Sequence, residues 1–150
     1  KLCLILLLPL WTHATIVQNQ KIDFGKMVFV PGSCDMAYDT GVITNISGNN
    51  ICSESSGNVG IYQIFATANT VVRITVNAHA DDGDGIVYTP QGQMTSDSDT
   101  QTVVPGNPVD INSGSSGVIT VRIGGRLVFQ SQVSANSTFN KSFSIEFTEQ

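Results

Sequence analysis

One stretch decides the fold: Val118-Ile119-Thr120-Val121-Arg122-Ile123-Gly124-Gly125-Arg126-Leu127-Val128-Phe129. Apolar and polar side chains alternate on both sides of its two glycines, which is the pattern of a strand with one buried face. Gly124-Gly125 predicts a tight hairpin turn, because both central positions of such a turn need a positive φ. The chain closes on the same alternation at Phe143, Ile145 and Phe147. Three strands that share one apolar face predict an opposing sheet that covers them.

Further short strands are expected along the chain, and no segment has the period of a helix. The expected ranges are 21–30 with an interruption at Gly25, then 42–46, 61–68, 71–79, 86–89, 103–104 and 109–111. The alternation is cleanest over 71–79, whereas 91–101 is polar and is expected to be an exposed loop or edge. Pro105 and Pro108 suit sheet edges. Short strands separated by turns are typical of an antiparallel immunoglobulin-like β-sandwich, with a closed barrel as the alternative.

Residues 1–14 have the composition of a secretory signal peptide. Lys1 precedes an apolar run from Leu2 to Trp11, and small residues follow it. This pattern predicts cleavage between Ala14 and Thr15. The run is shorter than the roughly 20 residues that a membrane-spanning helix needs, so the alternative is an uncleaved anchor that lies in the membrane interface. A single domain is expected over 15–150, with no membrane span in the mature form.

Charge and cysteine content narrow the class of protein. Twelve acidic residues outnumber seven basic ones, for a net charge of -5, which argues against nucleic acid or an anionic membrane as a partner. Cys3 lies in the signal region, which leaves Cys34 and Cys52 as a pair. A cysteine pair in an exported domain predicts a disulfide. A two-cysteine metal site is the alternative, but it lacks further ligands.

The sequence offers little support for catalysis or for a cofactor. His79 is the histidine that remains after signal removal, and no Gly-x-Ser-x-Gly motif supplies a nucleophile. We therefore expect neither an enzyme nor a cofactor. Asp81, Asp82 and Asp84 form a weak calcium candidate, although Ile86 occupies a position that a calcium loop fills with oxygen. Their Asp-Gly pairs make hairpin turns equally well without a metal.

Three Asn-x-Ser/Thr patterns occur, at Asn45, Asn136 and Asn140. Such patterns are glycosylation acceptors in a eukaryotic secretory pathway, and they also arise by chance in a chain rich in Asn and Ser. We expect these asparagines to be polar surface residues.

The N-terminal segment 15–24 favours a strand that is donated to a neighbouring subunit. It contains no proline, and Ile16, Ile22 and Phe24 fall in one alternating register. A donated strand adds to a sheet edge through main-chain hydrogen bonds and fills pockets with alternate side chains. Gln18 and Gln20 share that register and would fill pockets poorly. The alternative is that this segment is the first strand of its own sheet.

Several short motifs carry a family resemblance. Ile22-Asp23-Phe24-Gly25 resembles a Leu-x-Phe-Gly signature, and the stretch from Ile123 to Val128 resembles a Gly-Gly-Thr-Leu hairpin. Thr138-Phe139 and the final strand resemble a closing Thr-Tyr motif followed by alternating residues. The family is one of secreted bacterial all-β domains of unknown function. It is similar to the spore-coat U and archaic chaperone–usher pilins and to MatB-type fimbrillins.

The resemblance implies an exported structural or adhesive surface protein, in the manner of a pilin or fimbrial subunit that assembles by β-strand donation. The implied partners are copies of the chain or sibling subunits and a periplasmic chaperone. The implied location runs from the periplasm to the cell surface of a bacterium. The alternative is a monomeric secreted binding module for carbohydrate or a surface ligand, which would use exposed aromatic side chains and polar loops near Tyr88 or Asn49.

Overall fold

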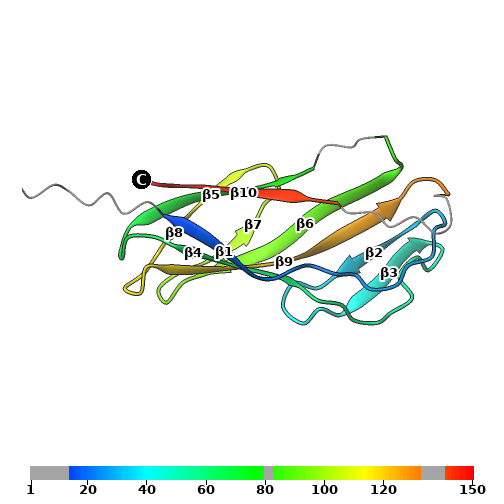
Figure 1. Cartoon of the computed structure of the whole chain (residues 1–150), viewed down its shortest axis with the longest axis horizontal. Helices are drawn as coiled ribbons and strands as arrows, with labels where there is room; N and C mark the ends of the chain where they lie inside the picture. The colour runs from blue at the N-terminus through cyan, green and yellow to red at the C-terminus, as the bar shows by residue number, and fades with distance from the viewer. Residues whose placement is uncertain (1–13, 80–82, 133–140) are drawn as a thin grey trace, which may run out of the picture.

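The computed structural model describes residues 14–79, 83–132 and 141–150, and its elements there are all strands. The strands are β1 (Thr15–Gln20), β2 (Gly32–Met36), β3 (Ile43–Gly48), β4 (Gly60–Phe65), β5 (Val71–Ala78), β6 (Ile86–Thr95), β7 (Thr100–Val103), β8 (Pro108–Asn112), β9 (Val118–Phe129) and β10 (Phe143–Glu149). They pair antiparallel in two sheets, of seven and three strands. The seven-stranded sheet runs β1-β4-β9-β2-β3, with β6 and β7 on the other side of β9, and the small sheet runs β10-β5-β8. The fold is therefore all-β and sandwich-like (Figure 1).

The 12-residue strand β9 organises the large sheet. On one side it pairs with β6 from Thr120 to Phe129. On the other side it pairs with β4 as far as Ile123 and then with β2 from Gly125 onward. The strand therefore changes its partner at Gly124-Gly125, and the long sheet consists of two halves that share β6 and β9.

The predicted hairpin at Gly124-Gly125 is wrong, because both glycines lie inside β9. A Cβ atom on Gly124 would collide with the carbonyl oxygen of Met36, and one on Gly125 would collide with that of Thr89. Gly125 also has a φ of 133°, which other residues rarely adopt. The glycines thus serve close backbone approach at the partner change. In the sequence alone, a pair of glycines at a close strand contact cannot be distinguished from a pair of glycines in a turn.

Three other boundaries differ from the expectation. The segment 21–30 forms no strand and makes isolated bridges at Asp23 and Met27, while the first strand is β1. It covers the core with its side chains instead of joining a ladder. The polar range 91–101 is largely strand, because β6 continues to Thr95 with Gly92 and Met94 turned inward and glutamines turned outward. Finally, β9 and β10 lie in opposing sheets.

The other predicted strands overlap observed strands, with ends that differ by up to three residues, whereas β2 was not predicted. In β5 the apolar residues Val72, Ile74 and Val76 are buried, and the residues between them are exposed or half-buried. The strand β7, which ends before Pro105, and the strand β8, which begins at Pro108, are edge strands as expected. Period-two patterning is reliable for β5 because one face of this strand is buried.

The core consists of two clusters of buried side chains at opposite ends of β9. The disulfide cluster comprises Phe24, Cys34, Met36, Ile43, Ile51, Cys52, Val59, Ile86, Tyr88, Leu127 and Phe129. The three-strand cluster lies between the two sheets and comprises Ile64, Val72, Ile74, Val76, Met94, Val103, Ile111, Ile119, Val121 and Ile123. Ile22 and Phe143, both partly buried, pack against both clusters.

Candidate functional site

The candidate site is the side of the sandwich where the edge strands β1 and β10 lie, which we call the open seam. Each of these strands has one strand partner in the described part of the chain, β4 for β1 and β5 for β10. Tyr62 of β4 packs edge-on against Phe143 of β10, with ring centroids 5.6 Å apart. Farther along, Glu149 of β10 accepts hydrogen bonds from the backbone N–H and hydroxyl of Thr67. These contacts place β10 over β4, next to β1.

The opposite side of the sandwich is closed. There β7 and β8 pack together, and the backbone N–H of Asn112 donates to the Asp99 carboxylate at 3.1 Å. Hydrogen bonds from Asn112, Gln101 and Thr100 lower the pKa of Asp99, and Asn112 makes the largest contribution. The edge residue Ile111 is only 1% exposed on this side.

Burial distinguishes the open seam from the closed side. The inward side chains of β10 are Phe143, Ile145 and Phe147, and all three are half-buried. Val76 and Ile74 of the neighbouring strand β5, which lie opposite Ile145 and Phe147 in the ladder, are at most 2% exposed. On β1, Ile16 lies opposite the fully buried Ile64, yet it is 37% exposed. An apolar strip with the length of one strand is therefore incompletely covered by the described residues.

The polar side chains beside Phe143 in the open seam carry no charge, whereas the Glu149 carboxylate at the other end of β10 is bound to Thr67. Gln18 of β1 donates a hydrogen bond to the Tyr62 hydroxyl at 3.2 Å. Burial raises the pKa of Tyr62, although the hydrogen bond from Gln18 opposes this. Behind Phe143, the Tyr88 hydroxyl donates to the Gly124 carbonyl at 2.6 Å, and burial followed by the proximity of Tyr62 raises its pKa. Both phenols stay neutral, so the strip suits an apolar or neutral occupant.

The three residues expected to be donated lie in different environments. Ile16 is in β1, which pairs with β4 from Thr15 opposite Phe65 onward, so the segment forms a strand of its own sheet. Ile22 is partly buried between the two clusters. Phe24 is 7% exposed and packs edge-on against Tyr88 at 6.0 Å. A shift in register between Gln18 and Gln20 interrupts the single alternating register that the sequence predicted.

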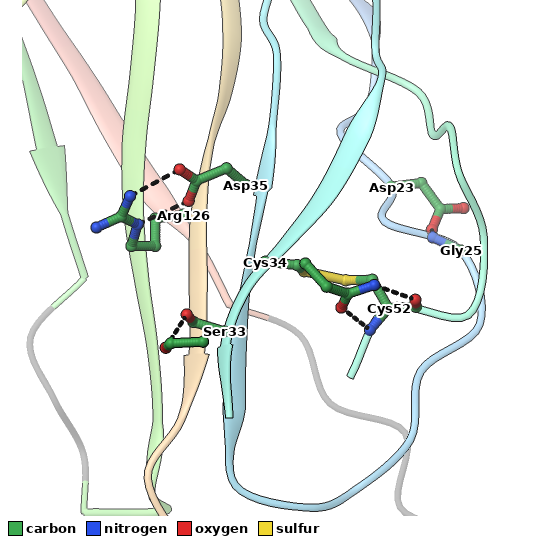
Figure 2. Close-up of a disulfide and its surroundings, with 9 residues drawn as sticks. Asp23, Gly25, Ser33, Cys34, Asp35, Cys52 and Arg126 are labelled. Atoms are coloured by element: carbon green, nitrogen blue, oxygen red, sulfur yellow. Dashed lines mark hydrogen bonds and ion pairs between the residues drawn. A yellow bond between two sulfur atoms is a disulfide. The ribbon is translucent and has the colours of Figure 1, made fainter. Parts of the chain in front are cut away.

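The expected disulfide is confirmed. Cys34 of β2 is bonded to Cys52 in the loop after β3, and both are at most 3% exposed (Figure 2). Asn45 of β3 holds this loop: its side-chain amide donates to the Cys52 carbonyl, and its side-chain oxygen accepts from the Cys52 N–H, each at 3.1 Å. The expectation that Asn45 is simply a polar surface residue is therefore wrong. Asn136 and Asn140 lie outside the described residues.

An ion pair lies on the outer face of the sheet, next to the disulfide. Arg126 of β9 and Asp35 of β2 are directly opposite in the ladder and form two parallel hydrogen bonds of 2.7 Å (Figure 2). The pair fixes the register of β2 on β9. Its partial exposure limits its energetic contribution.

Of the three aspartates in the weak calcium candidate, the structure describes Asp84. Asp81 and Asp82 lie outside the described residues. The Asp84 carboxylate accepts hydrogen bonds of 2.8 Å from the Ile86 N–H and from the Lys141 ammonium. Within the described ranges, no three His, Cys, Asp or Glu side chains come together as metal ligands do. Asp84 is engaged as a turn cap and an ion-pair partner.

The remaining candidate residues are also placed by the structure. His79 is exposed, with its Nδ1 3.5 Å from the Ser142 hydroxyl. The expectation that Tyr88 offers an exposed aromatic surface is wrong, since it is 6% exposed. Asn49 is exposed, and its side chain donates to the Pro31 carbonyl. The predicted cleavage site falls at the start of the described region, and residues 1–13 lie outside it.

No protein-family model matches the chain, and no curated protein matches it either. In the described part of the chain, no helix has the length and apolar character needed to cross a membrane.

Proposed function

We propose that the protein is an exported, pilin-like surface subunit with an immunoglobulin-like sandwich, in which a strand from another copy docks in the open seam. The half-burial of Phe143, Ile145 and Phe147 is the observation that carries the proposal. A strand laid along β10 would cover these side chains. On the closed side of the same sandwich β7 and β8 pack together and Ile111 is buried, which favours the seam as the place for docking.

Strand addition uses two properties of β10. Among the described residues, its backbone pairs with β5 on one side only, so the other side can form main-chain hydrogen bonds with an added strand. Its inward side chains are two residues apart, which matches the spacing of side chains on one face of a strand. The affinity would come from the backbone and from apolar burial.

The donor in this proposal is the segment Thr15–Gln20 of a second copy or a sibling subunit. In the described structure this segment pairs with its own β4, so donation requires it to leave that position, as in domain swapping. Donation of Ile22 and Phe24 as well would remove side chains from the donor's own core. A periplasmic chaperone would cover the seam before a donor arrives.

The disulfide supports the exported location. Structural disulfides persist in oxidising compartments such as the bacterial periplasm and the cell surface. The buried Cys34–Cys52 bond belongs to the core of this fold. We therefore place the mature chain outside the cytoplasm.

A matched pair of variants in β10 tests the proposal. Ile145→Asp puts a charge into the open seam, whereas Ser144→Asp puts the same charge on the exposed outer face of the same strand. Both are prepared in the chain that begins at Thr15, and circular dichroism checks their folding. Light scattering after size exclusion and negative-stain microscopy then measure assembly. We expect Ile145→Asp to abolish assembly and Ser144→Asp to assemble like the unaltered chain.

A second experiment tests the donor. A chain that begins at Lys21 keeps β10 but lacks the donor strand, so its addition to the full mature chain should shorten the assemblies in proportion to its amount. Assembly that is equally sensitive to both charge variants would contradict docking in the seam. Monomers in every folded preparation would instead favour the monomeric binding module.

A further inference from the structure

The disulfide belongs to only one of the two core clusters. Cys34 and Cys52 contribute to the disulfide cluster, and the three-strand cluster contains no cysteine. The disulfide cluster is built largely by chain segment 21–59, which packs on the ends of β6 and β9. The side chains common to both clusters, Ile22 and Phe143, are only partly buried. The packing between the two halves is thus weaker than the packing within each.

Segment 21–59 also has fewer backbone ladders than the rest of the fold. Its strands are β2 and β3, and the remainder is joined through isolated bridges at Asp23, Met27 and Val42. The Cys52 loop is held by the disulfide, by Asn45 and by single backbone hydrogen bonds. A segment with few strand-pairing hydrogen bonds opens locally more easily. The disulfide therefore contributes a large part of the stability that keeps segment 21–59 packed on β9.

We propose that the disulfide is a redox-sensitive latch for this half of the molecule. With the bond formed, segment 21–59 covers β9; with the bond reduced, the segment opens while the three-strand cluster stays folded. Opening uncovers Leu127 and Phe129 and frees the edge of β9 that β2 occupies. The inference is independent of strand docking in the open seam.

The chemistry of the latch is thiol–disulfide exchange. An external dithiol attacks the cystine through its thiolates; the cystine gains two electrons and two protons as the thiols of Cys34 and Cys52, and the dithiol becomes a disulfide. Oxidation by a protein disulfide runs the same step in reverse. Because both sulfur atoms are buried, reduction of the native protein requires transient opening of segment 21–59.

Hydrogen exchange measured by mass spectrometry tests the latch. The oxidised chain from Thr15 is compared with the Cys34→Ala/Cys52→Ala double variant and with the unaltered chain after reduction. We expect protection to fall on the order of a hundredfold in 21–59 and to fall also in 125–129. Protection in 71–78 and 118–123 should be retained. Size exclusion would reveal association through the uncovered edge of β9.

A control variant distinguishes local opening from general destabilisation. Val76→Ala removes buried volume from the three-strand cluster and leaves the disulfide intact. It should lower protection in 71–78 and 118–123 without lowering it in 21–59. Equal loss of protection in all strands after reduction, or a double variant that is unfolded throughout, overturns the proposal. Unchanged protection in 21–59 overturns it too.

Discussion

Gly124→Asn gives the sharpest test of the partner change in β9. Asn-Gly is the preferred pair at a tight hairpin turn, so this substitution would be harmless if residues 124 and 125 formed one. In the structure, a Cβ at residue 124 meets the Met36 carbonyl oxygen and the backbone around Ala37 and Tyr38. All of these atoms belong to the main chain, and rotation of a side chain cannot relieve the collision. The substitution must displace the end of β2 from β9.

The cost follows from that displacement. Overpacking a closely packed site costs about 1–3 kcal/mol, and each ladder hydrogen bond lost costs roughly 0.5–1.5 kcal/mol more. We expect a loss of about 3 kcal/mol, a large part of the roughly 5–15 kcal/mol that stabilises an ordinary domain. Urea unfolding followed by circular dichroism measures this loss as a lower midpoint.

Gly106→Asn is the matched control. Gly106 also has a positive φ, of 75°, but a Cβ there meets nothing within 4 Å. Asparagine tolerates this conformation comparatively well, so the control should lose less than about 1 kcal/mol. If Gly124→Asn is as stable as Gly106→Asn, the reasoning about close backbone approach in β9 is refuted.

Three further predictions follow from the same contacts. Tyr88→Phe should cost about 1–2 kcal/mol in thermal unfolding, because the Gly124 carbonyl loses its buried phenol donor; no cost would mean that another group satisfies this oxygen. Ile111→Ala should cost about 2–5 kcal/mol of stability at the closed side. Ile145→Ala at the half-buried seam should cost clearly less in the monomer, where no strand is docked. Equal losses of stability from the two substitutions in the monomer would contradict an open seam. Hydrogen bonds, chiefly from the Ser115 hydroxyl, lower the pKa of Asp97 below its usual 3.8, so its stabilising contribution is present above that pH and is lost as the pH falls through the lower folded value. Asp97→Asn should therefore destabilise the protein at pH 7 and have a diminishing effect in strong acid, and a cost independent of pH would refute this.

The disulfide illustrates a site that sequence could predict in part. Two cysteines in a chain with a signal-like start predicted the bond, and the structure contains it. The role of Asn45 was missed, because a single asparagine in a polar stretch carries no local sign of what its amide contacts. That contact depends on the path of the loop that brings Cys52 back to β3. The open seam was likewise invisible in the sequence, because it depends on which strands become edges.

By itself, the sequence determined the strand-rich character of the chain and which side chains of β5, β9 and β10 face inward. Alternation of apolar and polar residues is a local property, and the hydrophobic effect acts on it in any sheet that buries one face. Only the tertiary structure decided which strands pair, that Gly124-Gly125 lies inside β9, and that β1 and β10 leave a seam. The physical reason is that these features depend on hydrogen bonds and collisions between backbones far apart in sequence, and a glycine suits a turn and a close strand contact equally well.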